Sequence, residues 1–303
     1  MLATRSAIFL SLVSSTLASF HDFGIPYSDA TVNVRAFKVT GGYMTGGASA
    51  FLTPVVPGHE NIPVSMYAFL VEHNGTRIMI DLGLQSDPEN LPPTTAAYFS
   101  NGFAKVADVA GGIPKMLVAG GISLQSINAV MWSHAQFDHI DADFAGRKVT
   151  KIDFSKNNIT FGGLQALDYF GDGSFYLMNT PGHMSGHLTT LARTTSSSFI
   201  VLSGDTYHHS GQLRPRPELQ VAYPCPGELV EAAKSGISTD YFWSPDSELD
   251  PVTSRVSLDK IASFDADPDF LVVVAHDTTL DGLLPVLPAY LNQCAAEQYC
   301  VQI

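Results

Sequence analysis

The sequence predicts an α/β fold in which β-strands and helices form layers around one core. Two observations carry this prediction. Apolar runs of strand length alternate with turns along most of the chain, and stretches with helical spacing lie between them. Several apolar runs also end directly at a histidine or an aspartate. Strand ends of this kind place polar side chains at the edge of a rigid sheet, where functional loops are commonly held.

The first half of the chain contains one clear hairpin. In residues 64–83, two β-rich runs flank the pair Asn74-Gly75, which is typical of a tight turn. Residues 101–119 contain a Gly-Gly pair and a proline, so we expect short helices there. Residues 127–134 are predicted to form a strand whose C-terminal end carries His134.

The second half repeats strands that end in polar residues. The predicted strands cover residues 159–163, 175–183, 188–194, 198–206 and 269–277. Helical spacing occurs at residues 227–236 and 254–264. No internal repeat or second core is evident in the sequence, so we expect one domain over residues 19–303.

The composition argues against several classes of function. The 303 residues suffice for one large core, and 45% hydrophobic with only 15% charged residues is not the composition of a disordered chain. The formal net charge is −13, and no cluster of lysine and arginine occurs. Nucleic acids and anionic membrane surfaces attract basic patches, so we expect neither as a partner.

The N-terminus has the pattern of a secretory signal peptide. Arg5 precedes a mostly apolar stretch, and Thr16 and Ala18 have the spacing that signal peptidase accepts. We therefore expect residues 1–18 to be a signal peptide and the protein to be secreted; an ordinary first strand or helix is the alternative. No other stretch approaches the roughly 20 apolar residues of a membrane span.

Two sequons and the cysteines agree with an exported protein. Asn74 and Asn158 each begin an acceptor sequence for N-glycosylation. Cys294 and Cys300 could close a small disulfide loop in an oxidising compartment, which would leave Cys225 as the odd thiol. The sequence leaves this pairing open.

Histidines and aspartates at the strand ends favour a metal site. A lone histidine at a strand end is usually a polar residue whose hydrogen bonds are satisfied locally. Several such strand ends in one chain instead favour side chains that meet at a single site. Imidazole and carboxylate groups are ligands that zinc takes in catalytic sites. The residues at these ends are His134, His183, Asp205 and His276, and Asp138 and His139 lie in the short run that begins at His134.

Four short runs contain these residues, and they follow one another in the chain as HAQFDH at 134–139, TPGHMSGH at 180–187, LSGD at 202–205 and VAHD at 274–277. Together they resemble the metallo-β-lactamase superfamily, whose signature is His-x-His-x-Asp-His followed by PGH, GD and a last strand-end histidine. The resemblance covers nearly the whole chain after residue 18. It is nearest to the lactonase-like branch, including fungal secreted or gene-cluster-associated members. It implies an αββα sandwich of two facing β-sheets with helices outside.

The resemblance also implies a ligand set for one or two zinc ions at one edge of the sheets. The first ion would be held by His134, Gln136 and His183, the second by Asp138, His139 and His276, with Asp205 bridging both. Asp138 would also orient the attacking water or accept its proton. Lactonase relatives often place a tyrosine shortly after the bridging aspartate. Tyr207 matches that place loosely, and an ordinary loop aromatic is the equal alternative.

Gln136 departs from the signature at a ligand position. Its amide oxygen is a weaker ligand for zinc than an imidazole nitrogen. Three interpretations stay open: Gln136 ligates through oxygen, the first site is empty and the second works alone, or the protein is non-catalytic. His208 or His209 is a less favoured source of the missing nitrogen.

The implied chemistry is metal-assisted acyl hydrolysis, in which zinc activates a water that opens a cyclic ester or cyclic amide. The expected partner is therefore a small-molecule substrate. A thioesterase-type hydrolase on the same fold is the alternative enzyme. A non-catalytic protein that binds metal or a small molecule is the alternative outside enzymes. The sequence does not determine the substrate, the ring size, the metal or the oligomeric state.

Overall fold

The computed structural model describes residues 19–39, 44–84, 91, 93–102, 104–106, 111–140, 148–214, 216, 241–244 and 248–292. The expected signal peptide, the expected helix at 227–236 and the three cysteines lie outside these residues. Within the described ranges, no helix has the length and apolar character needed to cross a membrane.

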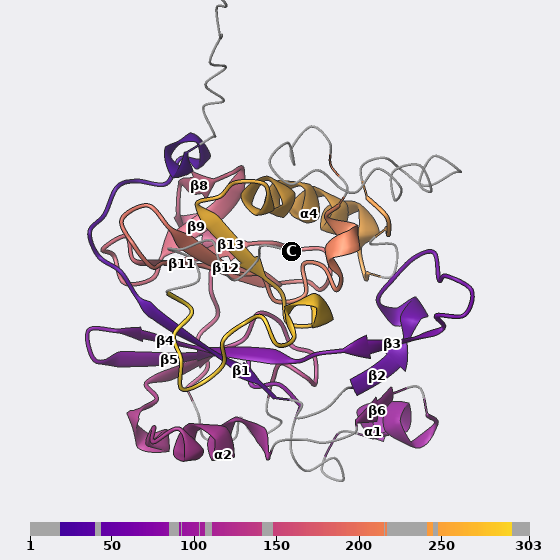
Figure 1. Ribbon diagram of the computed structural model, residues 1–303. Helices are drawn as coiled ribbons and strands as arrows, with labels where there is room; N and C mark the ends of the chain where they lie inside the picture. The colour runs from indigo at the N-terminus through magenta and orange to yellow at the C-terminus, as the bar shows by residue number, and fades with distance from the viewer. Residues whose placement is uncertain are drawn as a thin grey trace, which may run out of the picture.

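Two β-sheets face each other in the middle of the molecule (Figure 1). The four-stranded sheet has the order β1 (Asn33–Lys38), β4 (Tyr67–His73), β5 (Thr76–Ile80), β7 (Ala129–Met131). The six-stranded sheet has the order β13 (Phe270–Val273), β12 (Phe199–Leu202), β11 (Leu188–Arg193), β10 (Phe175–Asn179), β9 (Leu164–Asp168), β8 (Ile159–Phe161).

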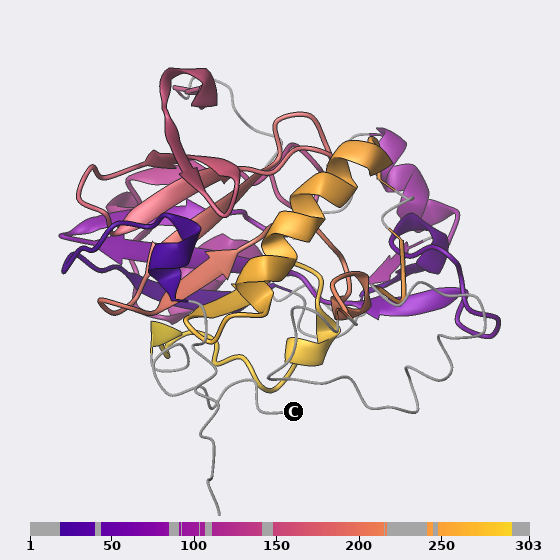
Figure 2. The same cartoon turned by 90° about the horizontal axis from the view of Figure 1, so that it is seen from above.

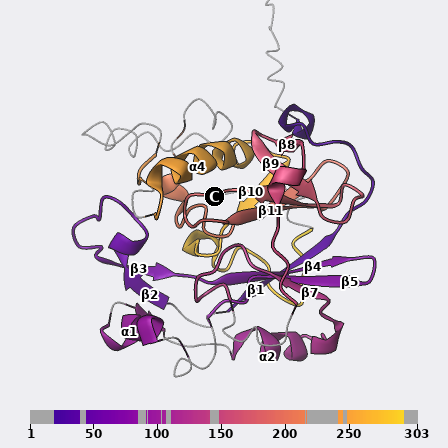
Figure 3. The same ribbon diagram turned by 180° about the vertical axis from the view of Figure 1, so that it is seen from behind.

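Helices cover the outer faces of these sheets, as Figures 1 and 3 show. Helix α4 (Pro251–Asp265) runs across the six-stranded sheet (Figure 2), and α2 (Gly112–Ala119) lies under the four-stranded sheet. The predicted αββα sandwich is therefore confirmed. A third, three-stranded sheet beside α1 (Pro93–Ser100) contains β3 (Asn61–Val64), β2 (Met44–Gly47) and β6 (Ala104–Val106).

Short 3-10 turns connect these elements. They are η1 (Phe20–Phe23), η2 (Ala48–Ala50), η4 (Leu124–Ser126), η5 (Phe154–Lys156), η6 (Ser210–Gln212) and η7 (Thr278–Leu280). Turns η2, η6 and η7 lie in the chain segments that surround the cavity described below.

The core follows from the two-residue period of the strands. In β10, Tyr176 and Met178 pack toward α4, whereas Phe175 and Leu177 pack between the two sheets. Each strand that is buried on both faces therefore reads as a continuous apolar run rather than as an alternating one.

The predicted hairpin is confirmed: Asn74 and Gly75 both have positive φ angles, 46° and 81°, between β4 and β5. The predicted strands in the second half are confirmed as well, with shorter bounds. The expectation of helices across 101–119 is correct for α2 and wrong for Ala104–Val106. That segment is a strand because it pairs with β2, with Lys105 opposite Thr45.

The polar strand ends gather at one edge of the sandwich. Strands β12 and β13 are parallel, and β10 runs in the same direction because two antiparallel pairings separate it from β12. The backbone N–H of Leu188 donates to the carbonyl of Ser133, 2.9 Å, and that of Tyr67 donates to the carbonyl of Ala275, 2.9 Å. These two bonds join the sheets directly beside the residues that follow β7 and β13.

Gly182 provides a test of how the loop before His183 is held. Its φ angle is 134°, and a Cβ there would lie 2.2 Å from the backbone N and Cα of Ser254 in α4. We expect Gly182→Ala to lower the free energy of unfolding by about 3 kcal/mol, because the backbone must move on both sides of the contact.

Gly186→Ala is the matched control in the same loop. Gly186 also has a positive φ, 83°, but no atom lies within 4 Å of its added Cβ. Only the backbone strain of about 1–2 kcal/mol is expected there. Denaturant unfolding of both variants measures the difference, and equal losses would contradict the packing argument.

Candidate metal centre

The structure brings every predicted ligand into one buried cluster. The side chains come from the loops that follow β7, β10, β12 and β13. Among the described residues, three groups each have potential ligand atoms within 4.8 Å of one another: His134, His183 and Asp205; Asp138, His139 and His276; and His183, His208 and Glu248. The first two are ligand groupings that the resemblance implies, and the third is not.

The first group includes the unusual glutamine. Nε2 of His134 lies 3.1 Å from Nε2 of His183, and Oε1 of Gln136 lies 2.9 Å from each of these nitrogens. Ligands of one tetrahedral zinc at 2.0–2.1 Å are about 3.3 Å apart. The three atoms therefore have nearly the separations of ligands that share an ion, and Gln136 occupies the position of the signature histidine.

The position of the proton on the His183 ring also bears on whether a cation lies between these atoms. In the tautomer whose Nδ1–H donates to Glu248, Nε2 of His183 carries a lone pair. That lone pair faces the carbonyl oxygen of Gln136, an atom that can only accept. A cation between these atoms removes the repulsion.

The second group is built around carboxylate oxygens. Nε2 of His276 lies 3.3 Å from Oδ2 of Asp138 and 3.1 Å from Oδ2 of Asp205. Nε2 of His139 lies 3.2 Å from Oδ1 of Asp205. Asp205 also lies 3.8 Å from Nε2 of both His134 and His183 through Oδ2. It therefore touches both groups, which is the geometry of a bridging ligand.

Contacts behind the ligands orient their rings. Nδ1 of His139 donates to Oδ2 of Asp81, 2.8 Å, and Nδ1 of His276 donates to the carbonyl of Ser65, 2.8 Å. Asp81 also accepts from the backbone N–H of Ser133, 2.7 Å. Each of these bonds turns an Nε2 atom toward the centre, as in metal sites whose histidines are backed by carboxylates or carbonyls.

Burial disfavours every charge here, and opposite charges compensate for it. Burial, followed by the neighbouring His139, lowers the pKa of His134 to about 4. Burial acts to lower the pKa of His276 too, but Asp205 and Asp138 outweigh it and raise that pKa to about 10. Burial acts to raise the pKa of Asp138, yet His139 and His276 bring it down to about 2. The carboxylates are anionic at neutral pH and present negative charge to a cation.

Three buried ligand atoms show whether the cluster suits a metal ion. Asp138 Oδ1 has no hydrogen-bond partner among the described residues, and His139 Nε2 and Asp205 Oδ1 have only each other, 3.2 Å apart as an ion pair without hydrogen-bond geometry. Leaving such atoms unpaired costs about 1–3 kcal/mol each, or more when they are charged. Carboxylate oxygen and imidazole nitrogen are metal-ligand types. The donor set therefore fits a divalent metal ion.

Tyr207 is not at this site, so its predicted role at the substrate carbonyl is wrong. Its side chain is 3% exposed and packs in the apolar cluster between the six-stranded sheet and α4. The next residue, His208, faces the cluster instead, with Nε2 3.4 Å from Oδ2 of Asp205. Side chains in this turn do not alternate between two faces as they do in a strand. The sequence therefore could not predict which of the two residues faces the cluster.

The sequence reasoning also missed Glu248. It lies in a loop before α4 with no recognisable motif, and its carboxylate contacts Nδ1 of both His183 and His208. His187 is not among the ligands that the resemblance implies, and both its nitrogens are engaged: Nδ1 donates to the carbonyl of Thr180, and Nε2 accepts from the backbone N–H of Asp205.

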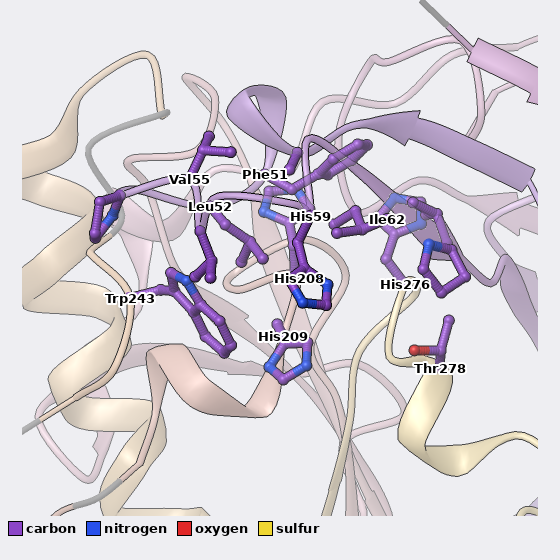
Figure 4. Close-up of a pocket in the computed structure, with 15 residues that line it drawn as sticks. Phe51, Leu52, Val55, His59, Ile62, His208, His209, Trp243, His276 and Thr278 are labelled. Atoms are coloured by element: carbon purple, nitrogen blue, oxygen red, sulfur yellow. The ribbon is translucent and has the colours of Figure 1, made fainter. Parts of the chain in front are cut away.

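A cavity of about 300 Å³ adjoins the cluster (Figure 4). His208 and His276 line one side of it, and its other walls are mostly apolar. The apolar lining includes Phe51, Leu52, Val55, Ile62 and Trp243. Small-molecule sites are commonly apolar cavities with a few convergent polar groups.

Similar proteins share most of the chain, although no protein-family model matches the sequence. The chain is 32% identical to gamma-lactamase FDB1 from Fusarium pseudograminearum (strain CS3096), over 88% of this chain and 79% of that protein. It is 30% identical to metallo-hydrolase mfmC from Annulohypoxylon moriforme, over 89% of this chain and 84% of that protein. At 33% identity, 91% of this chain matches only 37% of cytochrome P450 monooxygenase mpaDE from Penicillium brevicompactum.

The fold has relatives among solved structures. One is an N-acyl homoserine lactone hydrolase with the product N-hexanoyl-L-homoserine bound at its catalytic metal centre. The TM-score is 0.60 at 16% identity, covering 86% of this chain and 99% of that one. This likeness concerns the fold.

Asp81 allows the support behind a ligand to be tested. In Asp81→Asn, the amide N–H₂ can face Nδ1–H of His139, which favours the wrong tautomer for ligation. We expect metal affinity to fall by about 10–100-fold. Competition with a chelator measures it.

Asp172→Asn is the control, because Asp172 makes a similar 2.8 Å contact to His73, a residue at the tip of the β4–β5 hairpin. It should leave metal affinity unchanged. Equal affinities of the Asp81 variant and the wild type would show that this carboxylate does not support the centre.

Proposed function

This chain belongs to the metallo-β-lactamase superfamily, and we propose that it is a metal-dependent hydrolase that opens the ring of a lactam or a lactone. The gamma-lactamase relative supports the lactam, and the fold shared with a lactone hydrolase supports the lactone. Both reactions are hydrolysis of a cyclic acyl group, which one site can perform.

One observation carries the proposal: a buried cluster whose ligand atoms include several without hydrogen-bond partners adjoins a small, mostly apolar cavity at His276. His276 belongs to both, since it contacts Asp205 and also lines the cavity. A ring held by the apolar walls would have its carbonyl at the ligand cluster.

Zinc is the ion we propose, because the donors are imidazole nitrogens and carboxylate oxygens. The residues that would hold it are His134, Gln136, His183, Asp138, His139, His276 and the bridging Asp205. When bound, zinc lowers the pKa of a coordinated water to about 7 and polarises a substrate carbonyl.

The chain's own residues supply the rest of the chemistry. Oδ1 of Asp138 is free of other partners in the described part of the chain, so it can orient the attacking water and accept its proton. Asp205 is held in place by its backbone N–H, which donates to His187 at 3.0 Å. The apolar walls around Phe51 and Trp243 exclude bulk water from the ring.

The alternatives are less well supported by the cavity. A thioesterase acting on a long carrier needs an extended groove, whereas this cavity measures about 300 Å³. A non-catalytic role rests on Gln136 alone, and the remaining ligands keep competent atoms within reach of one another.

We also propose that the protein is secreted after cleavage of residues 1–18. Support comes from the N-terminal sequence pattern and from Asn74 and Asn158, which are both exposed and so accessible to glycosylation. N-terminal sequencing of protein recovered from culture medium tests the cleavage. A chain that stays inside the cell with residues 1–18 attached would rule it out.

Metal removal tests the enzymatic proposal. Purified protein should contain zinc, and dialysis against a chelator should abolish hydrolysis of a panel of γ-lactams and γ-lactones, because the proposed nucleophile is a water that zinc activates. Adding zinc back should restore turnover. Hydrolysis that persists in metal-free protein would sink the proposal.

Gln136→His tests the unusual ligand. An imidazole nitrogen binds zinc better than an amide oxygen, so we expect the affinity of the first site to rise by about tenfold. Zinc titration against a chromophoric chelator measures this, alongside turnover. A fall in affinity would indicate that Gln136 is itself the better-fitted ligand.

A further inference from the structure

His208 has the geometry of a ligand, although the superfamily signature does not include it. Its Nε2 atom lies 3.4 Å from Oδ2 of Asp205. That is closer than the signature ligands His134 and His183, whose Nε2 atoms are each 3.8 Å from the same oxygen. Two ligands of one zinc ion are about 3.3 Å apart, so His208 lies at ligand distance from the bridging carboxylate.

Glu248 lies beside both His183 and His208, hydrogen-bonded to the first and at ion-pair distance from the second. Its Oε2 accepts from Nδ1 of His183, and its Oε1 lies 3.3 Å from Nδ1 of His208. One buried carboxylate thus lies at the Nδ1 side of two imidazoles, and the Nε2 atoms of both face Asp205. A carboxylate behind the ring is the arrangement that orients metal-binding histidines and raises their basicity.

The rest of the surroundings hold His208 in this orientation. Its backbone N–H donates to Oε1 of Gln212, 2.7 Å, and its ring stacks on His276 with centroids 5.6 Å apart. The ring is 6% exposed.

The Nε2 atom of His208 lies close enough to Asp205 to replace the imidazole nitrogen that is missing at Gln136. The first group has two imidazoles and an amide oxygen where the signature has three imidazoles. His208 restores the count of nitrogens from a different loop, one that follows β12 and not β7.

We propose that His208 is a ligand of the first metal site and supplies the third nitrogen that Gln136 does not. His134, His183 and His208 then hold the ion together with Asp205, and Glu248 is the shared outer support of two of these rings. This inference rests on the proposed function in one respect: it takes the cluster to be a metal site.

The test compares three variants of the full chain. His208→Ala removes the ligand, and His208→Phe keeps the ring volume against His276 without a nitrogen. His209→Asn is the control: His209 is the next histidine and also lines the cavity, but it caps η6 through Nδ1, a role that asparagine can take. The readouts are zinc per chain by elemental analysis, affinity by chelator competition, and the visible spectrum of the cobalt-substituted protein.

We expect wild type to bind two ions. Both His208 variants should lose the affinity of one site by at least about 100-fold, more than an outer support alone costs. The second site should keep its ion, and the cobalt spectrum should change at one site. The His209→Asn protein should match the wild type in metal content.

Rescue makes the test specific. In the double variant Gln136→His with His208→Ala, the signature histidine returns, so metal content should recover. A structural role for His208 would not be repaired from position 136. If a His208 variant is unstable, recovery of both folding and metal in the double variant still supports ligation.

Retention of wild-type affinity and cobalt spectrum in both His208 variants overturns the inference, even if turnover falls, because His208 would then act on the substrate instead. Failure of the double variant to regain metal overturns it as well. Failure of the proposed function is a separate result: wild-type protein that binds metal but hydrolyses no lactam or lactone leaves the ligand count to be decided by the same titrations.

Discussion

The buried carboxylate of Asp205 is the constraint on which the site depends. It is 1% exposed, and every ion-pair partner it has in the described part of the chain is a histidine. An ionised carboxylate without compensation costs several kcal/mol in such a place. Compensation must therefore come from protonated imidazoles or from a metal ion. Since ligation requires neutral imidazoles, metal and protons compete for the same cluster.

The fold makes this arrangement possible because it fixes the donors before any ligand arrives. Parallel strands β12 and β13 deliver Asp205 and His276 to one edge, and hydrogen bonds across that edge join the two sheets. The loop before His183 is pressed against α4 at Gly182, where no larger residue fits. Loops held in this way present their side chains at low conformational cost.

The sequence was informative wherever a period or an ordered motif existed. Strands with apolar runs, the turn at Asn74 and the order of the ligand runs all follow from local patterns. Three features do not. Ala104–Val106 became a strand only through pairing with β2. Tyr207 and His208 follow a turn at Gly204, where neither the strand nor the helix period decides which side chain faces inward. Glu248 lies in a loop that reaches His183 only in the folded chain, so no local sequence pattern predicts this contact.

A metal site can keep its donor atoms even when one residue of the signature is replaced. A metal responds to which donor atoms reach a small volume, and not to the segment that carries them. Four loops border that volume here, so a nitrogen can arrive from beyond β12 as readily as from beyond β7. What distinguishes His208 from a bystander is its support: the carboxylate that orients His183 also lies behind it. An exchange of ligands between loops also places one imidazole at the wall of the cavity, so the residue proposed to complete the metal site also lines the proposed substrate cavity.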